Sequence, residues 1–165
     1  MKSIILFRHG KSDWDADYDM DYNRPLKKRG IKAAKKMGQL LNKKKETPDI
    51  IISSTALRAK NTAAIAKKTG KWISSIKYEK TIYGGSLNTI ISIIRRQNNK
   101  YNIICIVGHE PIFSSFLFKL NYLYFTKFPT AAMARIDFKT MKWNKIKLNK
   151  NMSRVKWFIK PKDID

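Results

Sequence analysis

Both histidines of the chain stand directly after runs of apolar residues. His9 follows Arg8 and the apolar run at 4–7, and His109 follows the apolar run at 103–107 through a single glycine. Short apolar runs of this kind are typical of buried strands, so both imidazole rings are expected at the ends of strands. We therefore predict that the two histidines, the only two in the sequence, share one site.

Arginines accompany the histidines at these strand ends. Arg8 precedes His9, and Arg58 falls in the first turn of a helix expected after a third apolar run. Guanidinium groups carry planar sets of donors that match phosphate oxygens, and helix N-termini favour anions. A neutral imidazole is a competent nucleophile toward phosphorus near pH 7, and a second imidazole can donate to the phosphoryl oxygens. The pattern predicts phosphoryl transfer through His9, with the two arginines and His109 holding the phosphate and with no metal or cofactor.

The elements that must position these side chains alternate between strands and helices. Continuous apolar strands separated by helices predict an α/β fold, a single-domain three-layer α/β/α sandwich with a mostly parallel central sheet. Such sheets bind ligands beyond the carboxyl ends of their strands, where both histidines are expected. A hairpin of 134–138 with 145–148 and an edge strand at 155–159 are expected to close the sheet. The other strands are expected at 3–7, 49–53, 76–79 and 101–107, and the helices at 26–41, 56–69, 87–96 and 111–120.

Three of the expected helices begin at recognisable signals. Ser54 and Thr55 precede the second helix and Ser86 precedes the third, and residues of these types favour N-cap positions. Pro111 is compatible with the first turn of the fourth helix.

The chain is strongly basic. It has 35 basic and 12 acidic residues, for a formal net charge of +23. Most of the basic residues are lysines, which favours solvated lysine faces over a dedicated nucleic-acid groove, although the charge would still attract acidic substrates. Nucleic acid is therefore not an expected partner.

Length and apolar content bound the class of protein. The 165 residues suit one domain with a full core, spanning 1–165. The single cysteine, Cys105, is expected to pack as a small hydrophobe in a reducing compartment. No apolar run approaches the ~18 residues that a membrane span needs, so the expected location is the cytoplasm, without membrane contact.

Four ordered segments of the sequence carry a family resemblance. They are LFRHGKSDW at 6–14, RPLKKRG at 24–30, SSTALRAKNTA at 53–63 and VGHEP at 107–111. In these motifs and their spacing the chain resembles the histidine phosphatase (phosphoglycerate mutase-like) superfamily, and within it the short phosphohistidine phosphatases. The resemblance implies a phosphoglycerate mutase-like fold in a single histidine phosphatase domain.

The resemblance also implies roles for particular residues. His9 would be the phosphorylated nucleophile, and the phosphate pocket would consist of Arg8, Arg58 and His109. Ser12, which lies in the first motif, is assigned to substrate binding. Larger relatives carry insertions that cover the pocket, and a chain of 165 residues has little room for them. An open pocket suits a phosphate that is carried by a protein.

Two carboxylates are candidates for a proton donor. A phosphomonoester needs an acid to protonate its poor leaving group, whereas the nitrogen of a phosphoramidate leaves with little help. Glu110 follows His109 directly, and Glu79 lies in the stretch where the mutases place their acid. The favoured role of Glu110 is to cap or charge the N-terminus of the following helix.

The expected function is a metal-independent phosphatase that acts through phospho-His9 on phosphohistidine of a protein. Two alternatives remain open. One is a small-molecule phosphomonoesterase or mutase that uses Glu110 or Glu79 as acid, so that its partner is a small phosphorylated molecule. The other is a basic nucleic-acid-binding module with a vestigial phosphate pocket.

An acidic loop follows the first motif, with aspartates at alternate positions from 13 to 21. The spacing faintly resembles a calcium-binding loop, but Tyr18 and Arg24 stand where that loop requires Gly and Glu. We therefore expect a solvated acidic loop.

Aromatic residues gather between positions 113 and 128. The simplest interpretation is core plus a hydrophobic loop, and the alternative is a surface for a partner. The residues are Phe113, Phe116, Phe118, Tyr122, Tyr124, Phe125 and Phe128.

Overall fold

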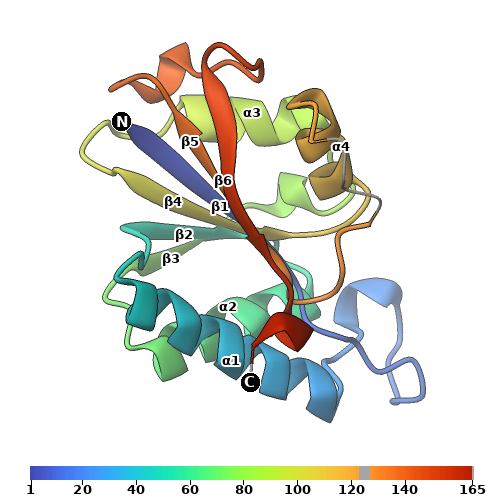
Figure 1. Cartoon of the computed structure of the whole chain (residues 1–165). Coiled ribbons are helices and arrows are strands. Elements are labelled where there is room, and N and C mark those ends of the chain that lie inside the picture. Colours follow the sequence, from blue (N-terminus) through green and yellow to red (C-terminus); the bar gives the residue numbers. More distant parts are fainter. Residues whose placement is uncertain (123–126, 165) are drawn as a thin grey trace.

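A central six-stranded sheet organises the chain (Figure 1). The computed structural model describes residues 1–122 and 127–164. The strands are β1 Lys2–Arg8, β2 Ile50–Ser53, β3 Ser75–Tyr78, β4 Ile103–Gly108, β5 Met133–Phe138 and β6 Ser153–Ile159. The α-helices are α1 Lys28–Lys44, α2 Leu57–Gly70, α3 Leu87–Arg95 and α4 Ile112–Lys119. Most of these elements were predicted to within about three residues at each end, which is the usual uncertainty of helix and strand boundaries.

The sheet is mostly parallel, and its strands follow the order β3-β2-β4-β1-β5-β6. β1, β2, β3 and β4 run parallel, whereas β5 pairs antiparallel with β1 and β6 pairs antiparallel with β5. Successive side chains of a strand point to opposite faces, so Ile4 and Leu6 pack against α3 and α4 while Ile5 and Phe7 pack against α1 and α2. The predicted three-layer α/β/α architecture is confirmed (Figure 1).

Helices α1 and α2 approach each other closely at a glycine. A Cβ atom on Gly38 would lie 2.3 Å from the carbonyl oxygen of Ala66, so a larger residue would force the two backbones apart. The indole nitrogen of Trp72 also donates to the Gly38 carbonyl, at 3.0 Å. This packing fixes α2 against α1 on one face of the sheet.

The loop that leaves β1 is held against the start of α1. A Cβ atom on Gly30 would lie 2.2 Å from the carbonyl oxygen of Lys11, and the Lys27 amide donates to the same oxygen at 2.9 Å. The residues directly after β1 therefore have a fixed path.

The predicted hairpin of 134–138 with 145–148 is wrong. The antiparallel partner of β5 is β6, which contains the expected edge strand at 155–159. Trp143 and Ile146 are instead buried beside α3, and the Trp143 indole donates to the Tyr101 carbonyl at 2.9 Å. Their apolar character reflects a loop that covers one end of the core.

Helix starts match the predictions in part. Ser86 caps α3 by accepting from a backbone amide of the first turn at 3.2 Å, as predicted. The prediction that Ser54 and Thr55 cap α2 is wrong, because Ala56 holds the N-cap position and no side chain bonds there. Pro111 immediately precedes α4 and does not lie in its first turn.

The aromatic stretch contributes to the core as predicted. Phe113, Phe116 and Phe128 are buried, whereas Phe118 is 82% exposed. Tyr124 and Phe125 lie outside the described residues.

Two further predictions concern burial and membranes. Cys105 is fully buried in β4, as predicted, and burial raises the pKa of its thiol. Within residues 1–122 and 127–164, no helix has both the length and the apolar character needed to cross a membrane.

Candidate active site

Strand pairing places the two histidines side by side. β1 and β4 are neighbours with Arg8 opposite Gly108, and the His9 amide donates to the Gly108 carbonyl at 3.1 Å. The ring centroids of His9 and His109 are 5.3 Å apart. The predicted convergence of the two rings is confirmed.

A cavity of about 300 Å³, which we call the histidine pocket, lies at this edge of the sheet. Both histidines and Ser12 line it, as the sequence predicted. Among the described residues, its lining includes a single carboxylate, that of Glu110, against several cations. The lining cations are Arg8, Lys11, Arg24 and Arg58. The pocket is therefore suited to a compact anion.

His9 is held as a neutral imidazole. Its Nδ1 lies 2.8 Å from the carbonyl oxygen of Gly10, and because a carbonyl can only accept, Nδ1 carries the ring proton. Burial is the main cause that lowers the pKa of His9 to about 3; nearby positive groups add to this effect, and the Gly10 carbonyl opposes it. Nε2 has no hydrogen-bond partner within the described part of the chain, so its lone pair is free for attack on phosphorus.

His109 is also neutral, and Ser54 orients its ring. His109 Nε2 lies 2.8 Å from Ser54 Oγ, which accepts from the Ala56 amide at 3.2 Å. In the tautomer in which Nε2 accepts the hydroxyl proton of Ser54, the ring proton of His109 lies on Nδ1, and that atom is a donor. Burial, followed by the positive charge of Arg58, lowers the pKa of His109 to about 4. The sequence suggested only a capping role for Ser54, and its contact with His109 depends on β2 and β4 being neighbours.

Arg8 and Arg58 reach the pocket from different elements. Arg8, at the end of β1, donates through Nη1 to the Phe128 carbonyl at 2.8 Å. Arg58 lies in the first turn of α2, as predicted, and donates to the Asp21 carbonyl at 2.8 Å and to the Asp21 carboxylate at 3.0 Å. Their buried Nε atoms have no partner among the described residues. The hydrogen bonds to Phe128 and Asp21 hold both guanidinium groups in place.

Asp21 is a site residue that the sequence did not reveal. Its carboxylate accepts from the Tyr83 hydroxyl at 2.7 Å and forms ion pairs with Arg24 and Arg58. Burial tends to raise the pKa of Asp21, but the bonds from Tyr83 and Arg58 outweigh it and hold that pKa below its usual value. The expected exposure of the acidic loop is confirmed for Asp21, whose side chain is 48% exposed, but its role at the site was not predicted. Five evenly alternating aspartates gave no signal that singles it out.

Arg24 also joins the pocket from this loop. Its Nε donates to Ser12 Oγ at 2.8 Å, and its guanidinium lies 3.5 Å from the centroid of the Trp14 ring. Ser12 therefore lines the pocket and also positions Arg24. Arg24 lies in the second family motif, which was the available signal for a functional role.

Glu110 lies at the pocket, but α4 engages its carboxylate. One oxygen accepts from the Ser114 amide at 2.8 Å, and the other accepts from the Ser114 hydroxyl. The predicted capping role is confirmed.

Glu79 does not line the pocket. Its carboxylate forms an ion pair with Arg96 at 2.8 Å. The alternative in which Glu79 stands at the site as the acid is wrong, because the chain turns after β3 and brings Tyr83 and Gly84 to the pocket instead.

The pocket combines fixed cations with two neutral imidazoles. Within the described ranges, no group of three or more His, Cys, Asp or Glu residues is placed to hold a metal ion. The arrangement can bind a tetrahedral anion beside the Nε2 atom of His9, with guanidinium groups matching its oxygens.

Sequence comparison finds relatives for this chain. Residues 4–81 match the model of the histidine phosphatase superfamily (branch 1). The uncharacterized protein Rv1276c of Mycobacterium tuberculosis is 33% identical over 137 residues, which cover 77% of this chain and 84% of that protein.

Solved structures share the fold over nearly the whole length. The SixA protein of Agrobacterium tumefaciens, classed as a phosphohistidine phosphatase, superposes with a TM-score of 0.81 at 25% identity, covering 97% of this chain and 98% of its own. The protein histidine phosphatase SixA complexed with tungstate superposes with a TM-score of 0.81 at 19% identity, covering 98% of both chains.

Proposed function

We propose that this chain, which belongs to the histidine phosphatase superfamily and is a phosphatase, removes the phosphoryl group from phosphohistidine on a protein. His9 is the nucleophile in this proposal. Arg8, Arg58 and His109 bind the phosphoryl oxygens, and the reaction uses neither a metal nor a cofactor.

The proposed reaction consists of two displacements at phosphorus. In the first, the Nε2 lone pair of His9 forms a bond to phosphorus while the P–N bond of the substrate breaks, and the leaving imidazole takes a proton from water. In the second, a water oxygen bonds to phosphorus while the bond from Nε2 breaks, which releases inorganic phosphate and a proton and restores neutral His9. Both steps break the same kind of bond, so the intermediate is no harder to hydrolyse than the substrate.

The fixed cations stabilise charge at the transition state. A phosphoryl group in transfer spreads negative charge over its three equatorial oxygens. Arg8 and Arg58 supply positive charge, and their bonds to the protein hold them in position before substrate arrives. The Nδ1 proton of His109 supplies a further donor.

The state of Glu110 is the single observation that favours phosphohistidine over a phosphomonoester. Glu110 is the only carboxylate that lines the pocket in the described part of the chain, and Ser114 engages both of its oxygens. A phosphoramidate nitrogen leaves with little help from an acid, whereas an alkoxide does not. The pocket therefore fits a substrate that carries its own good leaving group.

Two peptides of one sequence, phosphorylated on histidine or on serine, test this proposal. We expect kcat/KM for the phosphohistidine peptide to be higher by about 100-fold or more, the scale of a general-acid contribution. Glu110→Gln keeps an acceptor oxygen for the Ser114 amide, so the variant should fold and should retain phosphohistidine turnover. Serine turnover of comparable size that collapses in Glu110→Gln would instead establish a phosphomonoesterase.

A further inference from the structure

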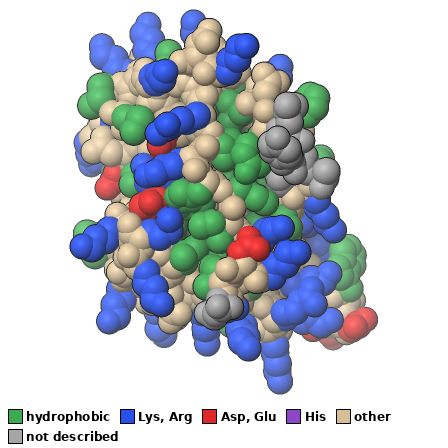
Figure 2. Space-filling model, in the orientation of Figure 1, with side chains coloured by type: hydrophobic (Ala, Val, Ile, Leu, Met, Phe, Trp, Pro, Cys, Tyr) green, Lys and Arg blue, Asp and Glu red, His purple; other side chains and the backbone are tan. Residues whose placement is uncertain are grey.

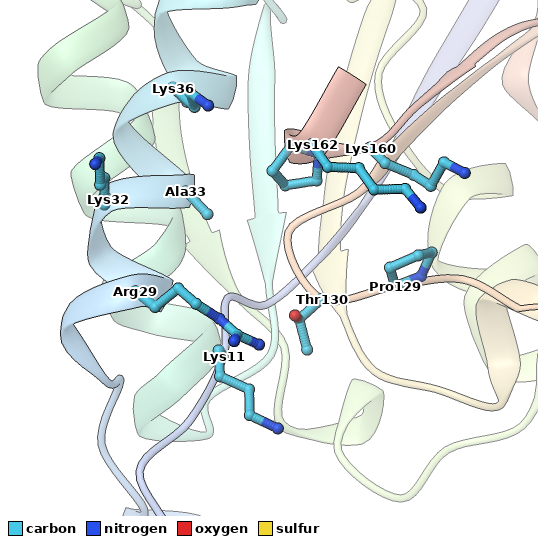
Figure 3. Close-up of a pocket in the computed structure, with 10 residues that line it drawn as sticks. Lys11, Arg29, Lys32, Ala33, Lys36, Pro129, Thr130, Lys160 and Lys162 are labelled. Carbon is cyan, nitrogen blue, oxygen red and sulfur yellow. The ribbon is translucent and has the colours of Figure 1, made fainter. Parts of the chain in front are cut away.

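A second cavity adjoins the histidine pocket. It has a volume of about 440 Å³ and lies between α1, the loop at 129–130 and the short helix η4 Pro161–Asp163 (Figure 3). We call it the basic cleft, because six cationic side chains line it. They are Lys11, Arg29, Lys32, Lys36, Lys160 and Lys162.

The cations occupy two walls of the basic cleft. Arg29, Lys32 and Lys36 follow the i, i+3, i+7 spacing of one helix face, and their Cα atoms span about 10 Å along α1. Lys160 and Lys162 stand on the other wall (Figure 3). Positive charge therefore extends over a length that exceeds a single phosphate group.

The cations of the basic cleft have no carboxylate partner among the described residues. No carboxylate of residues 1–122 or 127–164 lines the cleft or forms an ion pair with one of its six cations. Lys36 donates to the Ile164 carbonyl at 2.8 Å, which ties the C-terminal segment to α1 and keeps the second wall in place. Lysines and arginines are also spread over the face shown in Figure 2, but at the basic cleft they surround a cavity.

The basic cleft and the histidine pocket are adjacent. Lys11 and Thr130 line both cavities. A substrate with its phosphoryl group beside His9 thus has the basic cleft within reach of its neighbouring residues. The apolar part of the cleft is formed by Ala33, Pro129 and the alkyl parts of the lysine side chains. It gives room for a substrate peptide that runs along the cleft.

We propose that the basic cleft binds an acidic segment, rich in Asp and Glu, of the phosphoprotein whose phosphohistidine enters the histidine pocket. This inference rests on the proposed function and specifies its substrate class. Five of the six cations are lysines, whose flexible ammonium groups suit several carboxylates spread along a segment. No aromatic side chain of residues 1–122 or 127–164 lines the cleft to stack with bases, which disfavours single-stranded nucleic acid.

Two phosphohistidine peptides of equal length test the proposal through turnover, one with acidic and one with neutral flanking residues. We expect kcat/KM to favour the acidic peptide by about tenfold at low salt, the factor that a few weak exposed ion pairs supply. The double variant Arg29→Glu/Lys162→Glu should bring the ratio of the two values close to one. The matched control Lys35→Glu/Lys43→Glu changes charge equally on exposed residues outside the cleft and should keep the preference.

Binding of the unphosphorylated acidic peptide, measured by fluorescence anisotropy, separates this proposal from the proposed function. Saturable binding that Arg29→Glu/Lys162→Glu abolishes and the control retains would support the basic cleft even if no phosphohistidine were turned over. Equal turnover of both phosphohistidine peptides would overturn the cleft proposal and leave the phosphatase intact. Tighter binding of tripolyphosphate or of a single-stranded oligonucleotide at the same cleft would also overturn it.

Discussion

The histidine pocket and the basic cleft are adjacent cationic cavities with opposite construction. In the pocket, Arg24 and Arg58 are only 5% and 6% exposed, and both guanidinium groups bond to Asp21. In the cleft, Arg29 and Lys162 are exposed, and neither pairs with a described carboxylate. Fixed donors suit a transition state whose charge distribution never varies, whereas exposed cations without carboxylate partners suit substrates that differ in the placement of their acidic groups.

Replacing one arginine by alanine in each cavity should give the largest difference in kcat/KM between the histidine pocket and the basic cleft. Arg58→Ala should cost about 2 to 4 kcal/mol of transition-state stabilisation, or about 30- to 1000-fold in kcat/KM, because a preorganised donor is lost. Arg29→Ala should change kcat/KM by only about threefold, and only for acidic substrates, because an exposed ion pair is weak. Steady-state kinetics with folding checked by circular dichroism measure both effects. A near-wild-type rate in Arg58→Ala would place that residue outside the phosphate site.

Salt should affect the two cavities unequally. Raising ionic strength from about 0.02 M to about 0.2 M should reduce kcat/KM for an acidic phosphohistidine peptide by about fivefold, because exposed charges are screened. The neutral peptide should change by less than about twofold, because charges in a buried site are screened much less. Initial rates across a salt series check this. An equal salt dependence of kcat/KM for the two peptides would contradict the proposed difference between the cavities.

The buried histidines should make folding stability depend on pH. In the folded chain the pKa is about 3 for His9 and about 4 for His109, and both lie below the ordinary value of 6.5. At a pH between the folded and the ordinary pKa of each histidine, the unfolded chain therefore binds more protons than the folded chain. Stability should therefore be fully present above about pH 6.5 and should be lost as pH falls toward 4. Urea unfolding at several pH values from 4.5 to 7.5 measures how the free energy of unfolding changes with pH.

A matched pair of variants isolates this contribution. His9→Asn/His109→Asn should flatten the dependence of the free energy of unfolding on pH between about pH 5 and 6.5, which is roughly the range in which an ordinary histidine titrates. The cleft variant Arg29→Glu/Lys162→Glu should leave that slope in place. An unchanged slope in the histidine variant would show that the rings are not buried as neutral groups.

Metal chelation should have the smallest effect. Prolonged dialysis against EDTA should leave phosphohistidine turnover unchanged, because the proposed reaction draws its electrophilic assistance from arginines and His109. Phosphate release before and after dialysis checks this. A loss of activity that a divalent cation restores would contradict the proposed reaction.

The predictable part of the site lies at strand ends. Parallel strands bring their carboxyl ends to one edge, so His9, His109 and Arg58 could be placed together from apolar runs alone. Asp21 and Tyr83 could not, because a loop carries Asp21 across the pocket and a turn after β3 brings Tyr83 to meet it. Pattern reasoning predicts elements well, but it does not predict the path of irregular segments between them.

The basic cleft illustrates the same limit. Its lysines are visible in the sequence as part of the +23 net charge, but their gathering around one cavity depends on the C-terminal segment packing beside α1. The wrong hairpin at 145–148 has a related cause, since buried loop residues such as Ile146 carry the same apolar signature as a short strand.

Direct trapping of the phosphorylated enzyme tests the central role of His9. The protein is mixed with a labile radioactive phosphoryl donor, quenched in base and mapped by mass spectrometry, with His9→Ala as control. The account predicts an acid-labile, base-stable phosphate on His9 that is absent from the variant. Label on another residue, or full turnover by His9→Ala, would contradict it.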